Sequence, residues 1–142
     1  MGAMSEQQWR EFVSAQPRTA KLATVRADGR PHVAPIWIAL DEDGTIVFTT
    51  GATSVKGRNL ARDGRVTLCV DDEKPPFAFV IIEGTASISE DPAELLDWAG
   101  RVGGRYMGAD RAEEFGKRNG VPGELLVRVT PTRVIGADGL SD

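Results

Sequence analysis

The sequence is poor in the residues from which metal sites and catalytic triads are usually built. It contains one cysteine, Cys69, and one histidine, His32. A single cysteine excludes an internal disulfide and any metal site made of several cysteines, so no metal ligands are predicted. Cys69 lies in the β-branched run RVTLCVD, which is typical of a strand thiol rather than a nucleophile. His32 follows Pro31 at the start of a strand and is interpreted as a surface or structural residue.

The chain also lacks long apolar runs and an excess of basic residues. No run approaches the roughly 20 residues of a membrane-spanning helix, and the first ten residues show no apolar stretch typical of a secretory signal. The formal net charge of −4 argues against nucleic acid as the main partner. We therefore expect a cytoplasmic protein that binds neither membrane nor nucleic acid, and whose chemistry is supplied by a cofactor.

The order of patterns along the chain predicts a mainly β protein of one domain. Residues 5–142 are assigned to this domain, whereas residues 1–4 are set aside as an expression remnant or a disordered terminus. Ser5 and Gln8 match a capping box before a short helix. Strands are expected at 20–26, 32–40, 45–50, 65–72, 77–89 and 123–138, with helices at 54–63, 91–107 and 109–120.

These elements favour a closed or nearly closed antiparallel barrel of six strands with peripheral helices. The first three strands are expected to form a meander, because Asp28-Gly29 and Asp43-Gly44 are hairpin-turn signals. Strands do not alternate with long helices, so a doubly wound parallel sheet is excluded. Gly84 is expected to mark a bulge in the fifth strand.

One stretch, Thr49–Val70, concentrates positive charge in an acidic chain. Lys56 lies in the first turn of the expected helix, where Ser54 can cap the N-terminus. Free N–H groups and the helix dipole at such an end attract phosphate. The i, i+3 and i, i+4 spacings place Lys56 with Asn59 on one face and Arg58 with Arg62 on another. From spacing alone, an anion site and a solvated helix face are both open interpretations.

Aromatic residues mark two further candidates. Alternation along the second strand places Trp37 on the face opposite Ile36 and Ile38, where its ring either belongs to the core or lines a pocket for a flat heterocycle. Phe77 and Phe79 share one face of the fifth strand, either as core or as an interface with another subunit. The segment 103–118 is interpreted as the surface of a helix pair with salt bridges.

The segments AKLATVRADGRPHVAPIWIALDEDGTIVFTT, SVKGRNLARDGRVTLCVDD and FAFVIIEGTASIS, in this order, resemble the split β-barrel superfamily of pyridoxamine-phosphate-oxidase-like flavoproteins. The signature K-x-R-N-L-x-R-D-x-R-V is most similar to the B group of actinobacterial flavin/deazaflavin oxidoreductases, which use coenzyme F420. The likeness covers roughly residues 8–137. It implies a Greek-key-like split barrel of the FMN-binding type, and it favours the anion-site interpretation of Lys56.

The resemblance also implies a homodimer with two cofactor sites at the subunit interface. The cofactor phosphate would be held at the end of the third strand and the start of the short helix, by Thr49, Ser54, Lys56 and Asn59. Residues of the second strand would flank the ring system: Pro35, Ile36, Trp37 and Ile38. The segment Phe77, Ala78 and Phe79 would come from the other subunit. Some relatives carry an arginine where this chain has Ser54.

The function implied is hydride transfer from reduced F420 to a conjugated, electron-poor small molecule such as an enone, quinone or tetrapyrrole. No catalytic side chain is assigned. Two alternatives stay open: an FMN-dependent oxidase or reductase on the same fold, and a non-catalytic protein that binds F420 or heme.

Overall fold

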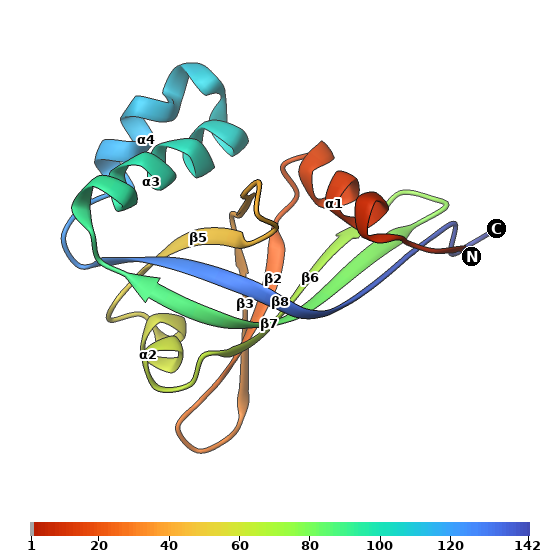
Figure 1. The fold of residues 1–142 in the computed structure, drawn as a ribbon, viewed down its shortest axis with the longest axis horizontal. Coiled ribbons are helices and arrows are strands. Elements are labelled where there is room, and N and C mark those ends of the chain that lie inside the picture. The colour runs from red at the N-terminus through yellow and green to blue at the C-terminus, as the bar shows by residue number, and fades with distance from the viewer. Residues whose placement is uncertain (1) are drawn as a thin grey trace.

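The computed structural model, which describes residues 2–142, reproduces most of the expected elements (Figure 1). The helices are α1 Glu6–Ala15, α2 Val55–Arg62, α3 Pro92–Met107 and α4 Ala112–Asn119, with a short 3₁₀ turn at Ala109–Arg111 before α4. The strands are β1 Gly2–Ala3, β2 Ala20–Val25, β3 Pro31–Ile36, β4 Ala39–Leu40, β5 Ile46–Gly51, β6 Arg65–Asp72, β7 Ala78–Ser89 and β8 Glu124–Asp138. The expected capping box at Ser5 and Gln8 and the bulge at Gly84 are both confirmed.

All eight strands form one antiparallel sheet in the order β3-β2-β6-β7-β8-β5-β4, with β1 paired to β8. The predicted count of six strands is wrong, because the second expected strand divides between β3 and β4 and because β1 was not expected. The predicted meander is wrong for the same reason: β3 pairs with β2, whereas β4 pairs with β5 at the other end of the sheet order. Since β3 and β4 follow each other in the chain, the two edges of the curled sheet meet at Trp37 and Ile38, and the result is a split barrel.

The N-terminal residues take part in this sheet. Gly2 and Ala3 pair with Asp138 and Ala137 of β8, and the Met4 amide donates to the Gly136 carbonyl. Setting residues 2–4 apart from the fold as a disordered terminus was therefore wrong. The terminus continues the long arm of β7 and β8 that extends to one side of the molecule in Figure 1.

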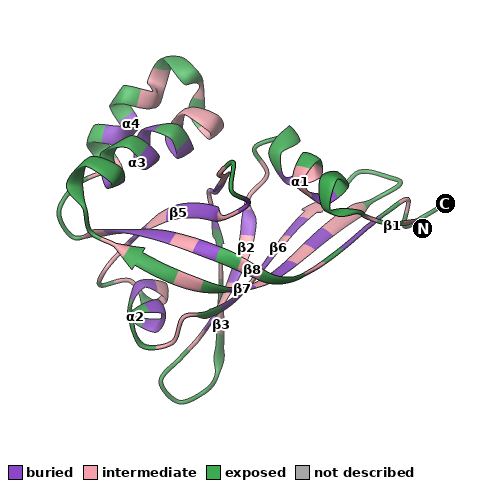
Figure 2. Ribbon diagram, viewed as in Figure 1, coloured by how far each residue is buried: buried purple, intermediate pink, exposed green. Residues whose placement is uncertain are grey.

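The sheet separates two apolar clusters. The larger lies inside the curl and contains fully buried residues from several strands, among them Leu22, Phe48, Leu68 and Ile82. The smaller lies between the outer side of the sheet and α3, where Trp98 packs against Val47 and Leu126. Figure 2 shows the matching alternation of buried and exposed residues along the long strands. Helix α3 is thus held against the sheet where β4 and β5 pair.

The first turn of α2 packs closely against the end of β5. The Ser54 hydroxyl accepts a hydrogen bond from the Gly57 amide at 3.0 Å and donates one to the Gly51 carbonyl at 2.7 Å. A side chain at position 57 is excluded, because its Cβ would lie 2.2 Å from the Gly51 carbonyl oxygen. The cap and the glycine together fix where Lys56 stands relative to β5.

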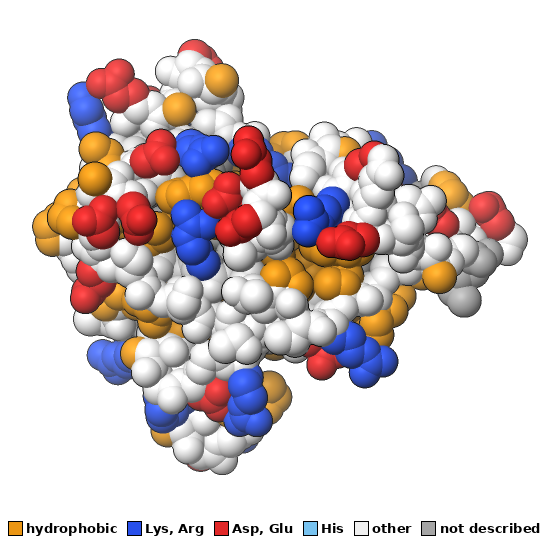
Figure 3. Space-filling model, viewed as in Figure 1, with side chains coloured by type: hydrophobic (Ala, Val, Ile, Leu, Met, Phe, Trp, Pro, Cys, Tyr) orange, Lys and Arg blue, Asp and Glu red, His pale blue; other side chains and the backbone are white. Residues whose placement is uncertain are grey.

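The surface carries charges of both signs. On the face shown in Figure 3, acidic and basic side chains are interspersed, with no large area of one sign. Within the described residues, no helix is long and apolar enough to cross a membrane.

Candidate functional site

A cavity of about 430 Å³ lies between the end of β5, the start of α2, the end of β3 and the helix pair α3 and α4. Five of the predicted cofactor-binding residues line it: Pro35, Ile36, Trp37, Thr49 and Lys56. Thr50, Gly51, Ala99, Val102, Asn119 and Glu124 also contribute to its wall, together with Thr19. A volume of this size is typical of pockets that bind small molecules. We call this cavity the Lys56 cavity.

Lys56 provides the positive charge of this cavity. Among residues 2–142 its ammonium group forms no salt bridge, although nine such pairs occur elsewhere. The backbone amides of Val55 and Lys56, in the first turn of α2, have no hydrogen-bond acceptor within this part of the chain. An ammonium group and free first-turn amides are the donors that bind phosphate at a helix N-terminus.

Two of the residues expected to bind phosphate are engaged elsewhere. The Ser54 hydroxyl caps α2 through Gly57 and Gly51, as described above. Asn59 is buried, and its amide group donates to the Thr24 hydroxyl at 3.0 Å and accepts from Arg62. The proposed division of faces is therefore wrong, because Asn59 pairs with Arg62 rather than acting beside Lys56.

Trp37 lies where the strand leaves the sheet. Its indole stacks on the Tyr106 ring, with centroids 5.0 Å apart and planes 5° from parallel. As expected from alternation, Trp37 packs with the outer cluster and Ile36 and Ile38 with the inner one. Trp37 thus packs on Tyr106 and also lines the Lys56 cavity. That this cavity takes a flat heterocycle stays a prediction. Ile38, in contrast, is fully buried and does not reach the cavity.

Two side chains of α3 form hydrogen bonds with backbone groups at the break between β3 and β4. The Tyr106 hydroxyl accepts from the Ile38 amide at 3.0 Å and donates to the Arg18 carbonyl at 2.7 Å. Arg105 donates to the carbonyls of Ile38, Val13 and Gln16. Buried backbone groups without partners are costly, so these two side chains allow the chain to turn between β3 and β4.

Sequence reasoning missed this role of α3. The prediction of a salt-bridged surface for 103–118 is wrong for Arg105 and Tyr106, which bind backbone groups. Burial lowers the pKa of the Arg105 guanidinium and raises the pKa of the Tyr106 hydroxyl. The hydroxyl consequently keeps the proton that it donates to Arg18. No spacing signal links position 106 to position 38, because their contact depends on how α3 docks.

Tyr106→Phe should destabilise the protein by about 1–2 kcal/mol, since it leaves the Ile38 amide and the Arg18 carbonyl without their partner. Urea unfolding followed by tryptophan fluorescence measures this loss. Thr132→Val is the matched control, because it removes a hydroxyl whose single bond, to the Glu83 carbonyl, is exposed. Equal stability of Tyr106→Phe and the parent chain would contradict the role given to this hydroxyl.

Glu124 is a charged residue of the cavity that the sequence did not suggest. It is the first residue of β8 and pairs with Gly51 at the end of β5. Burial raises the pKa of its carboxyl group, and the nearby Lys56 ammonium acts in the opposite direction. Its Oε2 atom is buried and has no hydrogen-bond partner in the described chain. The cavity thus holds one cation and one acidic group.

The segment Phe77–Phe79 does not reach the Lys56 cavity within one chain. It lines a separate apolar hollow of about 580 Å³ with Cys69, Leu140 and residues of β6. Phe77 is 38% exposed and has a left-handed backbone conformation, φ 62°, which is uncommon for a bulky residue. Burial is the main reason why the pKa of the Cys69 thiol is raised, consistent with its interpretation as a strand thiol.

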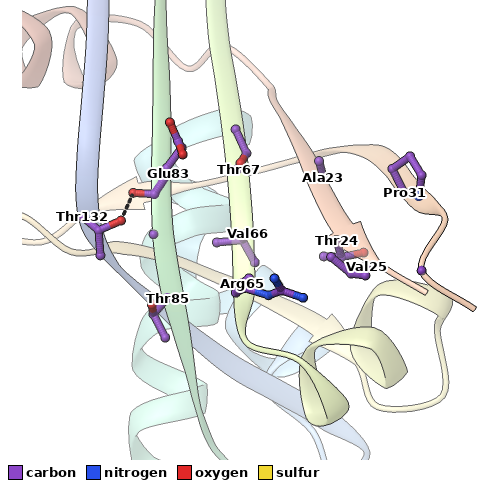
Figure 4. A pocket seen from close by; sticks show the side chains of 12 residues that line it. Ala23, Thr24, Val25, Pro31, Arg65, Val66, Thr67, Glu83, Thr85 and Thr132 are labelled. Carbon is purple, nitrogen blue, oxygen red and sulfur yellow. Dashed lines mark hydrogen bonds between the residues drawn. The ribbon is translucent and has the colours of Figure 1, made fainter. Parts of the chain in front are cut away.

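A further hollow of about 540 Å³ lies on β2, β6 and β7 (Figure 4). Arg65, Thr67, Glu83 and Thr132 line it, and none of the predicted site residues does. The Arg65 guanidinium forms a 2.8 Å salt bridge with Asp63, which does not line the hollow. The walls of this hollow lack aromatic side chains on which a flat ring could stack. We therefore place the candidate site in the Lys56 cavity.

Within residues 2–142, no group of three or more acidic, histidine or cysteine side chains is arranged to hold a metal ion.

Comparison with known proteins gives matches along nearly the whole chain. The family model described as pyridoxamine 5'-phosphate oxidase matches residues 5–137. A solved structure of a conserved hypothetical protein from Mycobacterium tuberculosis is 31% identical, with a TM-score of 0.84, and the alignment covers 97% of this chain and 87% of that chain. A solved structure named F420 reductase is 27% identical, with a TM-score of 0.69, over 87% of this chain and 94% of that chain.

A curated relative matches a shorter region. It is the 5a,11a-dehydrotetracycline/5a,11a-dehydrooxytetracycline reductase of Streptomyces rimosus, 38% identical over 73 residues. The alignment covers 46% of this chain and 51% of the reductase, so the match spans about half of that relative's length. Solved structures less than 25% identical include a heme storage protein from Vibrio cholerae, and they bear on the fold alone.

Proposed function

Because the chain belongs to the pyridoxamine 5'-phosphate oxidase family, we propose that it is an oxidoreductase that binds coenzyme F420 in the Lys56 cavity. Its substrate would be a conjugated, electron-poor small molecule of the enone, quinone or tetrapyrrole class. The observation that carries the proposal is the unpaired Lys56 ammonium at the start of α2, facing the same cavity as Trp37. The similarity to a protein named F420 reductase supports the choice of cofactor.

The residues of the cavity fit such a cofactor at both ends. Lys56 and the free amides of the first turn of α2 supply donors for its phosphate. Pro35, Ile36 and Trp37 present an apolar wall against which a tricyclic ring can lie. When bound in its reduced form, the cofactor supplies a hydride, and the protein binds and orients the cofactor.

The chain's own contribution to the reaction is therefore positional. Trp37 is immobilised by stacking on Tyr106, and the backbone after it is held by Arg105. An anchored wall restricts the orientations that the ring can adopt, which favours hydride transfer to an acceptor on its open side. The name of the curated relative, a reductase of dehydrotetracyclines, supports a conjugated acceptor.

We also propose that the working form is a homodimer. Phe77, Ala78 and Phe79 lie in an apolar hollow apart from the Lys56 cavity, so they can contact the ring only from a second copy. An exposed aromatic residue in an uncommon backbone conformation supports an interface there. Light scattering on the purified protein would measure the mass in solution, and a monomer at micromolar concentration would contradict this arrangement.

The function is tested by titrating the purified protein separately with F420 and with FMN, following cofactor fluorescence. We expect saturable binding of F420 at one site per chain, and tighter binding of F420 than of FMN. The reduced cofactor is then mixed with a panel of enones and quinones, and its reoxidation is followed by absorbance. Strong FMN binding without F420 binding would overturn the proposal in favour of an FMN enzyme. Tight F420 binding without turnover of any acceptor would favour a non-catalytic binding protein.

A further inference from the structure

Glu124 is placed by the sheet beside the anion-binding end of the Lys56 cavity. Its register partner is Gly51, the last residue of β5, and α2 begins a few residues later at Val55. A Cβ at position 51 would lie 4.0 Å from Glu124 Oε2, so the carboxylate stands over the turn that presents Lys56. Glu124 and Lys56 line the same cavity.

The negative charge of Glu124 is not satisfied by the protein. Its Oε2 atom is buried without a hydrogen-bond partner, and no salt bridge joins it to Lys56 in the described residues. Lys56, from α2, is the charged group that acts on it. The residues that line the cavity from β5 and α4 are neutral: Thr49, Thr50 and Asn119. The electrostatic potential at this end of the cavity therefore depends on Lys56 and Glu124 together.

The electrostatic energy of binding at this end of the cavity then depends on the number of charges on the phosphate. Formally, Lys56 contributes one positive charge and Glu124 one negative charge, so the pair is neutral when both are ionised. A phosphodiester, as in F420, carries one negative charge. A phosphomonoester, as in FMN, carries nearly two above its second pKa of about 6. The second charge adds attraction to Lys56 and repulsion from Glu124, so the carboxylate offsets the advantage that Lys56 alone would give a dianion. The dianion still pays the larger cost of leaving water, which favours the monoanion.

We propose that Glu124 is a specificity-determining residue, whose carboxylate makes the Lys56 cavity favour a phosphodiester monoanion over a phosphomonoester dianion. The inference rests on the proposed function, because it concerns the same cavity. It gives the acidic side chain beside Lys56 a role in discriminating between two cofactors whose ring systems are alike.

The experiment compares the dissociation constants of F420 and FMN at pH 8 for the parent chain and Glu124→Gln, using cofactor fluorescence. Glu124→Gln should strengthen FMN binding by about 10-fold, equivalent to about 1.4 kcal/mol, and F420 binding by a clearly smaller factor. Glu124→Asp retains the charge and should keep the parent's preference. Glu83→Gln is the matched control, because Glu83 lines the separate hollow of Figure 4, and it should leave both constants unchanged.

Circular dichroism and thermal melting check that each variant is folded, and Glu124→Ala provides a second neutral side chain if the glutamine variant is unstable. Equal changes for the two cofactors, no change, or weaker FMN binding in both neutral variants would overturn the role of Glu124. If the parent chain binds no F420, the proposed function itself fails. F420 binding by the parent with an unaltered preference in the neutral variants would overturn the Glu124 assignment alone.

Discussion

Lys56→Met weakens F420 binding by about 10- to 150-fold, which corresponds to the roughly 1.5–3 kcal/mol of a charge-assisted hydrogen bond. The substitution removes the ammonium group but retains an unbranched side chain with good helix propensity. Because Lys56 has no ion-pair partner in the described chain, folding should lose little, and the effect should be confined to binding. The measurement is the dissociation constant from a fluorescence titration, with the melting temperature as a check on folding.

Arg58→Met is the matched control for this prediction. Arg58 lies in the same helix, is exposed and forms no salt bridge within residues 2–142. The substitution therefore removes the same unit of charge from α2 without changing the cavity. Binding by Arg58→Met should stay within about 2-fold of the parent, as expected for an exposed, screened charge. Equal weakening in both variants would show a general charge effect, and an unchanged constant for Lys56→Met would remove Lys56 from the site.

Arg105→Met has the largest expected effect on stability. The guanidinium donates to three carbonyls, those of Ile38, Val13 and Gln16, and so joins α3 to the strand break and to the end of α1. Losing a charged donor shared by several carbonyls should cost about 2–4 kcal/mol. The melting temperature should fall by roughly 6–16 °C. Differential scanning calorimetry measures this loss.

Arg101→Met controls for the removal of a cation from α3. The Arg101 guanidinium lies over the Trp98 ring and within 3.6 Å of Asp97, at a site where its side chain is 53% exposed. Surface pairs of this kind contribute about 0–1 kcal/mol. If Arg101→Met proved as destabilising as Arg105→Met, the carbonyl contacts of Arg105 would not explain its effect. In folded Arg105→Met, weaker F420 binding would further link the strand break to the Lys56 cavity.

Several local features could be predicted because the information lies within a few residues. The bounds 65–72 match β6, and α3 at Pro92–Met107 begins one residue after the start of the expected range 91–107. Ser54 caps α2, as expected. Such features depend on residue patterns and caps that act on their own neighbours in the chain.

The break at Trp37 and Ile38 could not be predicted in the same way. Alternation continues through residues 32–40 and favours a single strand, and the sequence gives no signal for a stop. The backbone leaves the sheet because Arg105 and Tyr106, almost seventy positions later, offer it other hydrogen bonds. The contacts of Asn59 could not be predicted for a similar reason, and its role in cofactor binding stays a prediction. Helical spacing indicates its face, whereas its partner Thr24 belongs to a strand distant in sequence.

The sequence by itself determined the types of element, the positive helix start at Lys56 and, through resemblance, the family. These depend on local conformational preference and on the order of motifs. The tertiary structure decided which of the cations faces the cavity, that Trp37 and Lys56 share it, and that Glu124 stands beside them. Pairing of Gly51 with Glu124 is a long-range register between β5 and β8, and such registers arise only when the whole sheet is assembled.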